Sequence, residues 1–487
     1  MSDHRIDVGG VQVSPEHYIG GARVGSPTTF EDRSPLDWNL KLADVARGDA
    51  ATADAAISAA VEAFPAWAAL GPAVRGVLLR RLADLIDENI EPLAKVECLD
   101  MAMLYESLRL RVLSRGARNF RAYADLAEQY DERVWSSNGT ANRVMRMPAG
   151  PTVVITPWNA PFMLSTWKCA PALAAGNTVI LKPAEWSPLS CSVLADLAHE
   201  AGLPPGVFNV VQGIGEQVGA ALVNDPRVRR ISFTGSPETA RHIGVAAARN
   251  IVPFTAELGG KGPFVVFADA NLDAAAKKAA AQYDDSGQVC LAGTRLLVEA
   301  SVRDEFMQRF NAYVDAHVLG DSRDATTTIS PMIHPEHVAR VAAFVDRARA
   351  NGDTIVRGGQ LHRDGGLWYE PTLIEPASND SEVVQHEVFG PVLTVQTFAD
   401  ETEAIELANS TMYGLSAIVY TGSHERAERM GRAIRAGTVW TNCFLIRDLT
   451  APFGGIGTSG IGREGGNYAL DFCSDLKTVQ VLDGTTA

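Results

Sequence analysis

The apolar positions recur with different periods in two parts of the chain. Before residue 130 they recur every three or four residues, which predicts helices over residues 52–64 and 73–100. After Pro151, short runs rich in β-branched residues alternate with helical stretches. These runs occupy residues 152–155, 178–181, 207–211 and 230–233, and then residues 263–267, 294–298, 392–395 and 417–420. The alternation predicts two successive α/β units, each with a parallel sheet covered by helices.

A polar stretch, residues 130–142, separates these two parts and contains Asn138-Gly139. This dipeptide lies between Val134-Trp135 and Val144-Met145, and it is typical of a tight hairpin turn. Near the C-terminus, the sequence of residues 477–482 is typical of a single strand. Such a strand must pair with another strand, for which a second subunit is one candidate.

The composition argues against several classes of protein. The 487 residues include 43 basic and 58 acidic side chains, a net charge of −15, and 46% of them are apolar. The apolar share argues against disorder, and the acidic balance argues against a partner that is nucleic acid or an anionic membrane. We expect a cytoplasmic protein, because the N-terminus has no apolar leader and no stretch approaches the ~18 apolar residues of a membrane span. The six cysteines lie far apart and form no cluster with histidines, so we expect reduced thiols and no metal site.

Three residues are candidates for covalent chemistry. Cys290 follows a glycine-containing turn, where a thiolate would be a strong nucleophile once its pKa is lowered. Glu257 ends an apolar run beside a glycine-rich turn, and partial desolvation there would raise its pKa into the range of a general base. Asn159 follows a predicted strand and carries an amide that could stabilise an oxyanion. A buried thiol, a loop acid and a turn amide are the structural alternatives.

Two turns are candidates for binding phosphate. In the first, Gly213, Gly215 and Gly219 follow a strand, but the third glycine comes one position too late for a dinucleotide fingerprint. In the second, Ser236 can cap a helix that begins at Pro237 and leaves free amides at its positive end. Helix capping alone would explain either turn.

Glu185 ends the segment Lys182-Pro183-Ala184-Glu185, directly after a predicted strand. An acid in this position can bind ribose hydroxyls and would repel a 2′-phosphate, which favours NAD over NADP. A solvated loop carboxylate is the alternative.

The order and spacing of these segments resemble the aldehyde dehydrogenase superfamily, from about Tyr18 to the C-terminus. The interval of 33 positions from Glu257 to Cys290 is typical of that family. The motifs are Pro157-Trp158-Asn159, Lys182-Pro183-Ala184-Glu185, Phe233-Thr234-Gly235-Ser236, Glu257-Leu258-Gly259-Gly260-Lys261, Gly287-Gln288-Val289-Cys290, Glu387-Val388-Phe389-Gly390-Pro391-Val392, Pro452-Phe453-Gly454-Gly455 and Ser459-Gly460-Ile461-Gly462-Arg463-Glu464. One departure is Asp285, which stands where many members have Asn.

The resemblance implies an α/β fold with three parts. These are a Rossmann-like cofactor domain (residues 1–129 and 148–256), an α/β catalytic domain (257–455) and a small β oligomerisation element (130–147 and 470–487). The element would extend the sheet of a neighbouring subunit, so a homodimer or homotetramer is expected.

The resemblance also implies a role for each candidate residue. Cys290 would attack the aldehyde carbon, Asn159 and the Cys290 amide would hold the oxyanion, and Glu257 would activate the water that hydrolyses the thioester. NAD would be the cofactor, with Lys182 and Glu185 at the adenosine ribose. The residues implied to contact NAD are Ile155, Thr156, Pro157, Trp158, Lys182, Ala184, Glu185, Gly215, Gly219, Phe233, Gly235, Ser236, Leu258, Gly259, Glu387 and Phe389.

Residues 115–120, 444–449 and 462–466 resemble the branch that acts on hydroxymuconic and aminomuconic semialdehydes. In that branch, arginines matching Arg115 and Arg447 are implied to bind the substrate carboxylate, since a guanidinium can hold a carboxylate with two parallel hydrogen bonds. The alternative is a structural role, with Arg447 paired to Asp448.

Other functions remain open for the whole chain. They are oxidation of neutral aliphatic or aromatic aldehydes, a CoA-acylating semialdehyde dehydrogenase, and a non-catalytic binding protein with the same fold. Glu257 argues against the CoA-dependent class, which often lacks the base.

Overall fold

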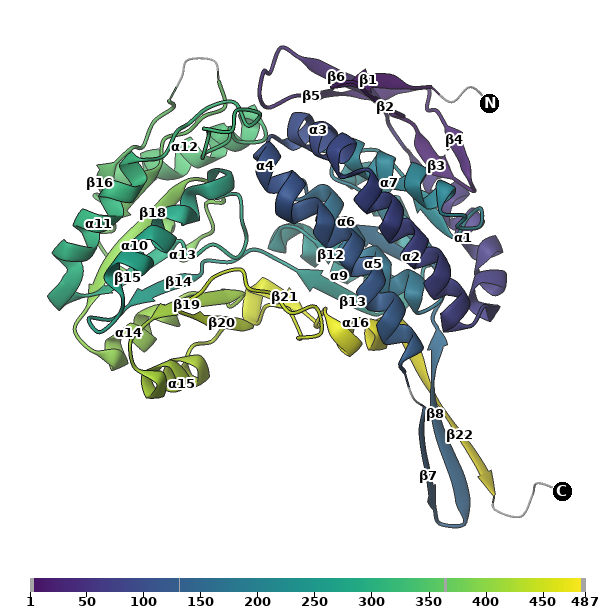
Figure 1. Cartoon of the computed structure of the whole chain (residues 1–487). Helices are drawn as coiled ribbons and strands as arrows, with labels where there is room; N and C mark the ends of the chain where they lie inside the picture. The colour runs from purple at the N-terminus through teal and green to yellow at the C-terminus, as the bar shows by residue number, and fades with distance from the viewer. Residues whose placement is uncertain (1–3, 131, 363–365, 483–487) are drawn as a thin grey trace.

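The computed structural model describes residues 4–130, 132–362 and 366–482, which form two α/β lobes and a projecting three-stranded sheet (Figure 1). The α/β fold predicted from the sequence is confirmed. Within the described residues, no single helix is both long and apolar enough to cross a membrane. The helices Ala50–Ala69 and Pro72–Glu88 meet that test only as a pair, and a bend of 118° separates them.

The N-terminal part contains two small sheets and a group of helices. The strands are β1 (Ile6–Val8) with β2 (Val11–Val13), and β5 (Thr29–Arg33) with β6 (Lys41–Ala46). The helices are α1 (Ala50–Ala69), α2 (Pro72–Glu88), α3 (Ile90–Met101), α4 (Tyr105–Ser107) and, after a π-helical turn at Leu108–Val112, α5 (Leu113–Glu128). The helices predicted over residues 52–64 and 73–100 are confirmed, and the second range divides into α2 and α3. The chain breaks at Asn89, whose side chain donates to the Leu85 carbonyl (2.9 Å) and competes with the helical hydrogen bonds.

The first large sheet has the strand order β21-β13-β12-β9-β10-β11-β3-β4. Strands β9 to β13 are parallel, and the strands predicted between residues 152 and 233 are confirmed. The bounds are β3 (His17–Ile19), β4 (Ala22–Val24), β9 (Thr152–Ile155), β10 (Val179–Lys182), β11 (Phe208–Val210), β12 (Arg230–Thr234), β13 (Phe254–Glu257) and β21 (Gly460–Ile461).

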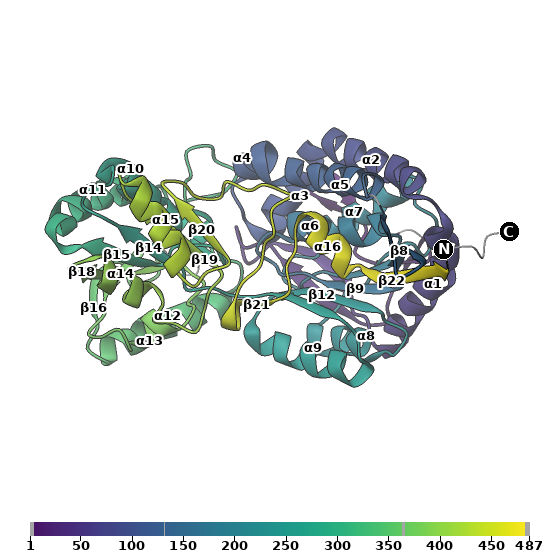
Figure 2. The same ribbon diagram turned by 90° about the horizontal axis from the view of Figure 1, so that it is seen from below.

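Helices cover both faces of this sheet, as Figure 2 shows. Alternate strand residues face opposite ways: Val154 and Leu181 join the core under α2, α5, α6 and α7, while Val153 and Ile180 join the core under α1, α8 and α9. The additional helices are α6 (Pro161–Ala174), α7 (Leu189–Glu200), α8 (Ala220–Asn224), α9 (Pro237–Asn250) and α16 (Gly466–Phe472). Burial on both faces explains the continuous apolar runs of the parallel strands.

The second large sheet has the order β16-β17-β18-β15-β14-β19-β20, with only β16 antiparallel to its neighbour. Its strands are β14 (Pro263–Val266), β15 (Arg295–Glu299), β16 (Thr354–Arg357), β17 (Thr372–Glu375), β18 (Val392–Phe398), β19 (Ser416–Tyr420) and β20 (Thr438–Thr441). Its helices are α10 (Leu272–Ala280), α11 (Arg303–Asp315), α12 (Pro335–Ala350), α13 (Glu382–Gln385), α14 (Glu401–Ala408) and α15 (His424–Ala433). The second predicted series of strands is confirmed.

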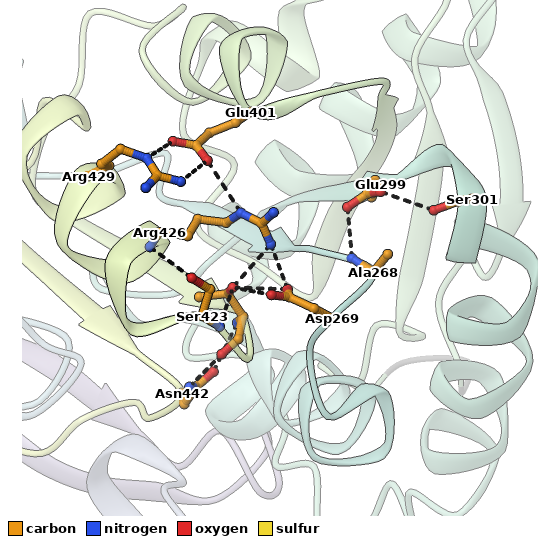
Figure 3. A network of polar contacts seen from close by, with 10 residues as sticks. Ala268, Asp269, Glu299, Ser301, Glu401, Ser423, Arg426, Arg429 and Asn442 are labelled. Atoms are coloured by element: carbon orange, nitrogen blue, oxygen red, sulfur yellow. Dashed lines mark hydrogen bonds and ion pairs between the residues drawn. The ribbon is translucent and has the colours of Figure 1, made fainter.

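A polar network joins α14 and α15 to the loop after β14 (Figure 3). Arg426 pairs with Asp269 (Nη1 to Oδ1, 2.7 Å) and with Glu401 (Nε to Oε2, 3.3 Å), and Arg429 also pairs with Glu401 (2.7 Å). Single exposed ion pairs contribute little, but shared partners fix the geometry of these helix ends.

The projecting sheet, called the arm below, consists of β7 (Arg133–Ser137), β8 (Thr140–Pro148) and β22 (Ser474–Leu482). Asn138 and Gly139 both have positive φ (53° and 70°), as a tight hairpin turn requires, so the predicted hairpin is confirmed. The predicted C-terminal strand pairs with β8 of the same chain. In Figure 1 the arm extends well beyond the first lobe.

Candidate active site

The parallel strands of the first sheet end together at one edge. The strand register pairs Ile155 with Lys182 on one side and with Phe233 on the other, and pairs Thr234 with Glu257. Strands β10 and β12 flank β9, so the strand order reverses here, which is the place where open α/β sheets bind ligands. Other predicted cofactor residues lie in the loops that follow these strands, namely Thr156, Pro157, Trp158, Ala184 and Leu258.

Lys182 and Glu185 form a compact pair at this edge. The Lys182 ammonium donates to Glu185 Oε2 (3.1 Å) and to the Pro183 carbonyl (2.8 Å). Burial alone would raise the pKa of Glu185, but Lys182 together with the backbone amides of Glu185 and Gly215 outweighs it and holds that pKa below its usual value. Glu185 is therefore ionised at neutral pH, in the state that repels a further phosphate. The turn Gly215–Gly219 lies close to the Lys182 side chain, since a β-carbon at Gly219 would be 3.6 Å from Lys182 Cδ.

The second phosphate candidate has the predicted geometry. Helix α9 begins at Pro237, and Ser236 caps it by accepting from the Thr239 amide (3.1 Å). A β-carbon at Gly235 would lie 2.4 Å from the Phe233 ring, so any larger residue there would have to displace this ring. Next to it, Thr234 Oγ1 is buried and has no hydrogen-bond partner among the described residues. Free helix amides and an unpaired hydroxyl fit a ligand rich in phosphate and ribose oxygens.

The loop before Cys290 adopts an unusual conformation. Asp285, Ser286 and Gly287 have consecutive positive φ angles of 52°, 54° and 65°, and non-glycine residues rarely adopt this conformation. Ser286 Oγ donates to the Ser330 carbonyl and fixes the turn. Asn159 reaches the same loop, where its Nδ2 donates to the Gln288 carbonyl at 2.8 Å. The structure thus brings Asn159 beside the cysteine loop, 129 residues away in sequence.

Two glycines allow the Glu257 turn to contact both Cys290 and Glu387. A β-carbon at Gly260 would lie 2.7 Å from the Cys290 carbonyl oxygen, and one at Gly259 would lie 2.0 Å from Glu387 Oε2. The Gly260 amide donates to Glu387 Oε1 at 2.8 Å. The nucleophile candidate, the base candidate and a predicted cofactor residue therefore converge on one turn.

The side chain of Glu257 has the environment expected of a base. It is 6% exposed, and neither carboxylate oxygen has a hydrogen-bond partner within the described residues. Burial, and after it the nearby Glu464, raises its pKa well above the ordinary value, against the opposing charges of Lys168, Arg447 and Arg463.

The Cys290 thiol also has a raised pKa. Burial raises it to about 12, Glu387 and Glu257 act in the same direction, and Arg447 opposes them. Desolvation and two carboxylates outweigh one guanidinium. Removing the thiol proton therefore requires a base.

A buried polar cluster that was not predicted from the sequence lies beside this base. Lys168 contacts Glu464 and donates to Ser232 Oγ (3.2 Å), and Trp167 Nε1 donates to Glu464 Oε2 (2.6 Å). The available signal was Lys168 itself, the one charged residue of helix α6.

Arg115 and Arg447 lie on the same aromatic ring. Their guanidinium carbons are 5.5 Å and 5.6 Å from the Trp167 ring centre, and Arg447 is 3.6 Å from that of Phe453. Burial first and then Arg447 lower the pKa of Arg115 to about 10. Within the described parts of the chain neither arginine has an ion-pair partner, and Asp448 instead accepts from the Thr450 amide (2.8 Å).

A sheet edge suited to a dinucleotide, beside a cysteine and a buried base, is typical of an NAD-dependent oxidoreductase that works through a covalent intermediate. The profile of the Aldehyde dehydrogenase family matches residues 23–479, and the chain belongs to this family.

The individual comparisons agree. The chain is 39% identical to a 2-hydroxymuconic semialdehyde dehydrogenase of Pseudomonas sp. (strain CF600), covering 96% of this chain and 99% of that protein. It is 38% identical to a 2-aminomuconic semialdehyde dehydrogenase of Danio rerio, covering 96% and 98%. The crystal structure of an indole-3-acetaldehyde dehydrogenase with NAD+ superposes with a TM-score of 0.94 at 37% identity, covering 97% of each chain. The protein is an NAD-dependent enzyme that oxidises aldehydes.

Proposed function

We propose that Cys290, Glu257 and Asn159 carry out the oxidation. The Cys290 sulfur attacks the aldehyde carbon, and Glu257, whose raised pKa suits a proton acceptor, takes the thiol proton. Asn159 and the Cys290 amide stabilise the oxyanion of the thiohemiacetal. NAD, when bound, supplies the hydride acceptor, and a thioester remains on Cys290. Glu257 releases the thiol proton to solvent and then takes a proton from the water that attacks the thioester carbon. The C–S bond breaks, which gives the carboxylic acid and returns Cys290 as a thiolate.

The observation that carries this proposal is the convergence of the three residues on one turn. Asn159 bonds to the cysteine loop, Gly260 lies against Cys290, and the Glu257 carboxylate is buried without a partner among described groups. A Cys290→Ala variant should lose at least about 10³-fold in the rate of NADH formation while it still binds NAD. Near-normal oxidation by this variant would refute the assignment. Product formation in the absence of CoA would exclude the CoA-acylating alternative.

We propose Lys182, Glu185, Ser236, Glu387 and Phe389 as the residues that hold NAD, with Glu185 and Lys182 at the adenosine ribose and Glu387 and Phe389 at the nicotinamide riboside. The unpaired Thr234 hydroxyl and the open first turn of α9 support this placement.

The proposed substrate is a semialdehyde that carries a carboxylate, such as 2-hydroxymuconic semialdehyde. Two neighbouring guanidinium groups without an ion-pair partner in the described chain, beside the base and the thiol, favour an anionic ligand. The first two relatives above, named for muconic semialdehydes, support the same class.

Arg447→Ala tests this substrate class. The variant should lose about tenfold to a hundredfold in kcat/KM for an acidic semialdehyde, and far less for a neutral aldehyde of equal length. Equal losses on both substrates would reject the role of Arg447 in binding the substrate carboxylate. Arg432→Ala, at an exposed position on α15, is a matched control that should change neither value.

We also propose that the arm joins copies of the chain into a homodimer or homotetramer. Strand β7 is exposed along its whole length, and Leu476, Val481 and Leu482 of β22 expose apolar side chains. We further propose that the chain divides into the three parts predicted from the sequence, namely the cofactor domain, the catalytic domain and the oligomerisation element. Six unpaired thiols support a cytoplasmic location.

A further inference from the structure

Helix α12 contacts three successive carbonyl groups of the loop that carries Glu387 and Phe389. Arg340 donates from Nη2 to the Glu387 carbonyl (2.9 Å) and from Nη1 to the Val388 carbonyl (2.5 Å). One turn earlier, His337 Nε2 lies 2.7 Å from the Phe389 carbonyl. Because a carbonyl only accepts, Nε2 carries the proton and donates. Residues 337 and 340 are three positions apart and therefore share one face of the helix.

The loop needs this support. Phe389 has a φ of 57°, in the left-handed region that bulky residues avoid. Gly390 lies directly on the helix, since a β-carbon there would be 2.7 Å from Val341 Cγ2. His337 is 6% exposed, and burial lowers its pKa to about 4, so it is neutral at physiological pH with a single donor.

The same end of α12 also contacts the first lobe. The His337 ring lies 5.1 Å from the Trp158 ring, which in turn lies 5.3 Å from the Phe389 ring. One turn earlier, His334 stacks on Trp186 with 4.4 Å between ring centres and 4° between planes. Trp186 directly follows Glu185, so this helix end touches segments from both ends of the proposed NAD site.

We propose that His337 and Arg340 are positioning residues for NAD. They fix the backbone of residues 387–389, and this sets the directions of the Glu387 carboxylate and the Phe389 ring. Neither residue is assigned a contact with the substrate. This inference rests on the cofactor role proposed above for Glu387 and Phe389.

The test measures NAD affinity at equilibrium together with the kinetic constants of His337→Ala, His337→Gln and Arg340→Ala. His337→Ala should raise the KM and Kd for NAD about tenfold and leave the aldehyde KM within about twofold. His337→Gln should restore most of the affinity, because its amide can donate to the same carbonyl. Arg340→Ala should raise both NAD values about threefold, because its guanidinium is partly solvated.

Arg349→Ala is the matched control. This residue lies in the last turn of the same helix and bonds to Asp346 and the Gly359 carbonyl, away from the loop, so its NAD affinity should equal that of the wild type. If His337→Ala does not fold, His337→Gln with intact affinity and the threefold loss in Arg340→Ala still support the proposal.

Glu387→Gln separates this inference from the proposal beneath it. If Glu387→Gln leaves NAD affinity unchanged, the cofactor assignment and the positioning role are both overturned. If Glu387→Gln weakens NAD but neither His337→Ala nor Arg340→Ala does, only the positioning role is overturned. The double variant Glu387→Gln/His337→Ala should lose less affinity than the product of the two single losses, because both changes disable one loop.

Discussion

The two sides of the site are built in different ways. The cofactor side consists of the ends of regular parallel strands, where strand register places Lys182, Ile155 and Phe233 in a row. The cysteine side consists of loops from distant parts of the sequence, with a left-handed backbone at Asp285 and buried ionisable groups at Cys290 and Glu257. Regular geometry is enough to recognise a common ligand, whereas the bond-making side needs desolvated charge and a distorted backbone.

The largest effect should follow from removing the buried base. Glu257→Gln should lower the steady-state rate by about 10²–10⁴-fold, because proton transfer by a positioned base contributes that much. The measurement is NADH formation at saturating substrate, with the exposed Glu375→Gln on β17 as control. A Glu257→Gln variant with wild-type turnover would show that the chemistry on the cysteine side does not depend on this carboxylate.

A smaller effect should come from filling the space between the two sides. Gly259→Ala would place its β-carbon 2.0 Å from Glu387 Oε2, so that the carboxylate must move, and the KM for NAD should rise about tenfold or more. Gly431→Ala, on α15, is the control, because a β-carbon there would have no described neighbouring atom within 4 Å. This variant should leave the kinetic constants unchanged and stabilise its helix by up to about 1 kcal/mol. An unchanged KM in the first variant would mean that the contact has no role in binding.

The cofactor side should show its own selectivity. Because Lys182 holds Glu185 ionised, Glu185→Gln should lower the preference for NAD over NADP about fivefold to tenfold. The ratio of kcat/KM values for the two cofactors gives the answer. Wild-type enzyme that prefers NADP would contradict the ribose role of Glu185.

The smallest effect concerns stability of the cysteine loop. Burial raises the pKa of Asp285 to about 6, with Arg111 opposing, so the folded chain binds more protons than the unfolded chain between about pH 4 and 6. The stability associated with this carboxyl is present at low pH and is lost as pH rises through 6. Asp285→Asn should therefore stabilise the protein by about 1 kcal/mol more at pH 8 than at pH 5. Solvent screening reduces this difference, because the Asp285 side chain is partly exposed. Urea unfolding at the two pH values measures this, and a pH-independent gain would contradict it.

The sequence predicted the cofactor side better than the cysteine side. Strands, the Ser236 cap and the Asn138-Gly139 turn follow from local patterns, and the structure confirms them. The helical range 73–100 is confirmed, but its break at Asn89, where a side-chain hydrogen bond competes with the helical ones, was not predicted. The pKa of Cys290, the cluster of Lys168 with Glu464, and the contacts of His337 depend on residues brought together only by folding. No local pattern records such contacts.

The stacking of Trp186 on His334 gives this enzyme an internal optical reporter. An indole pressed flat against an imidazole across two lobes emits differently from one that has lost this neighbour, so its fluorescence should follow small rotations of one lobe against the other. The chain has eight tryptophans, so the fluorescence of a Trp186→Phe variant must be subtracted from that of the wild type to isolate the emission of Trp186. The change of this difference with time would report lobe motion during turnover without any attached dye.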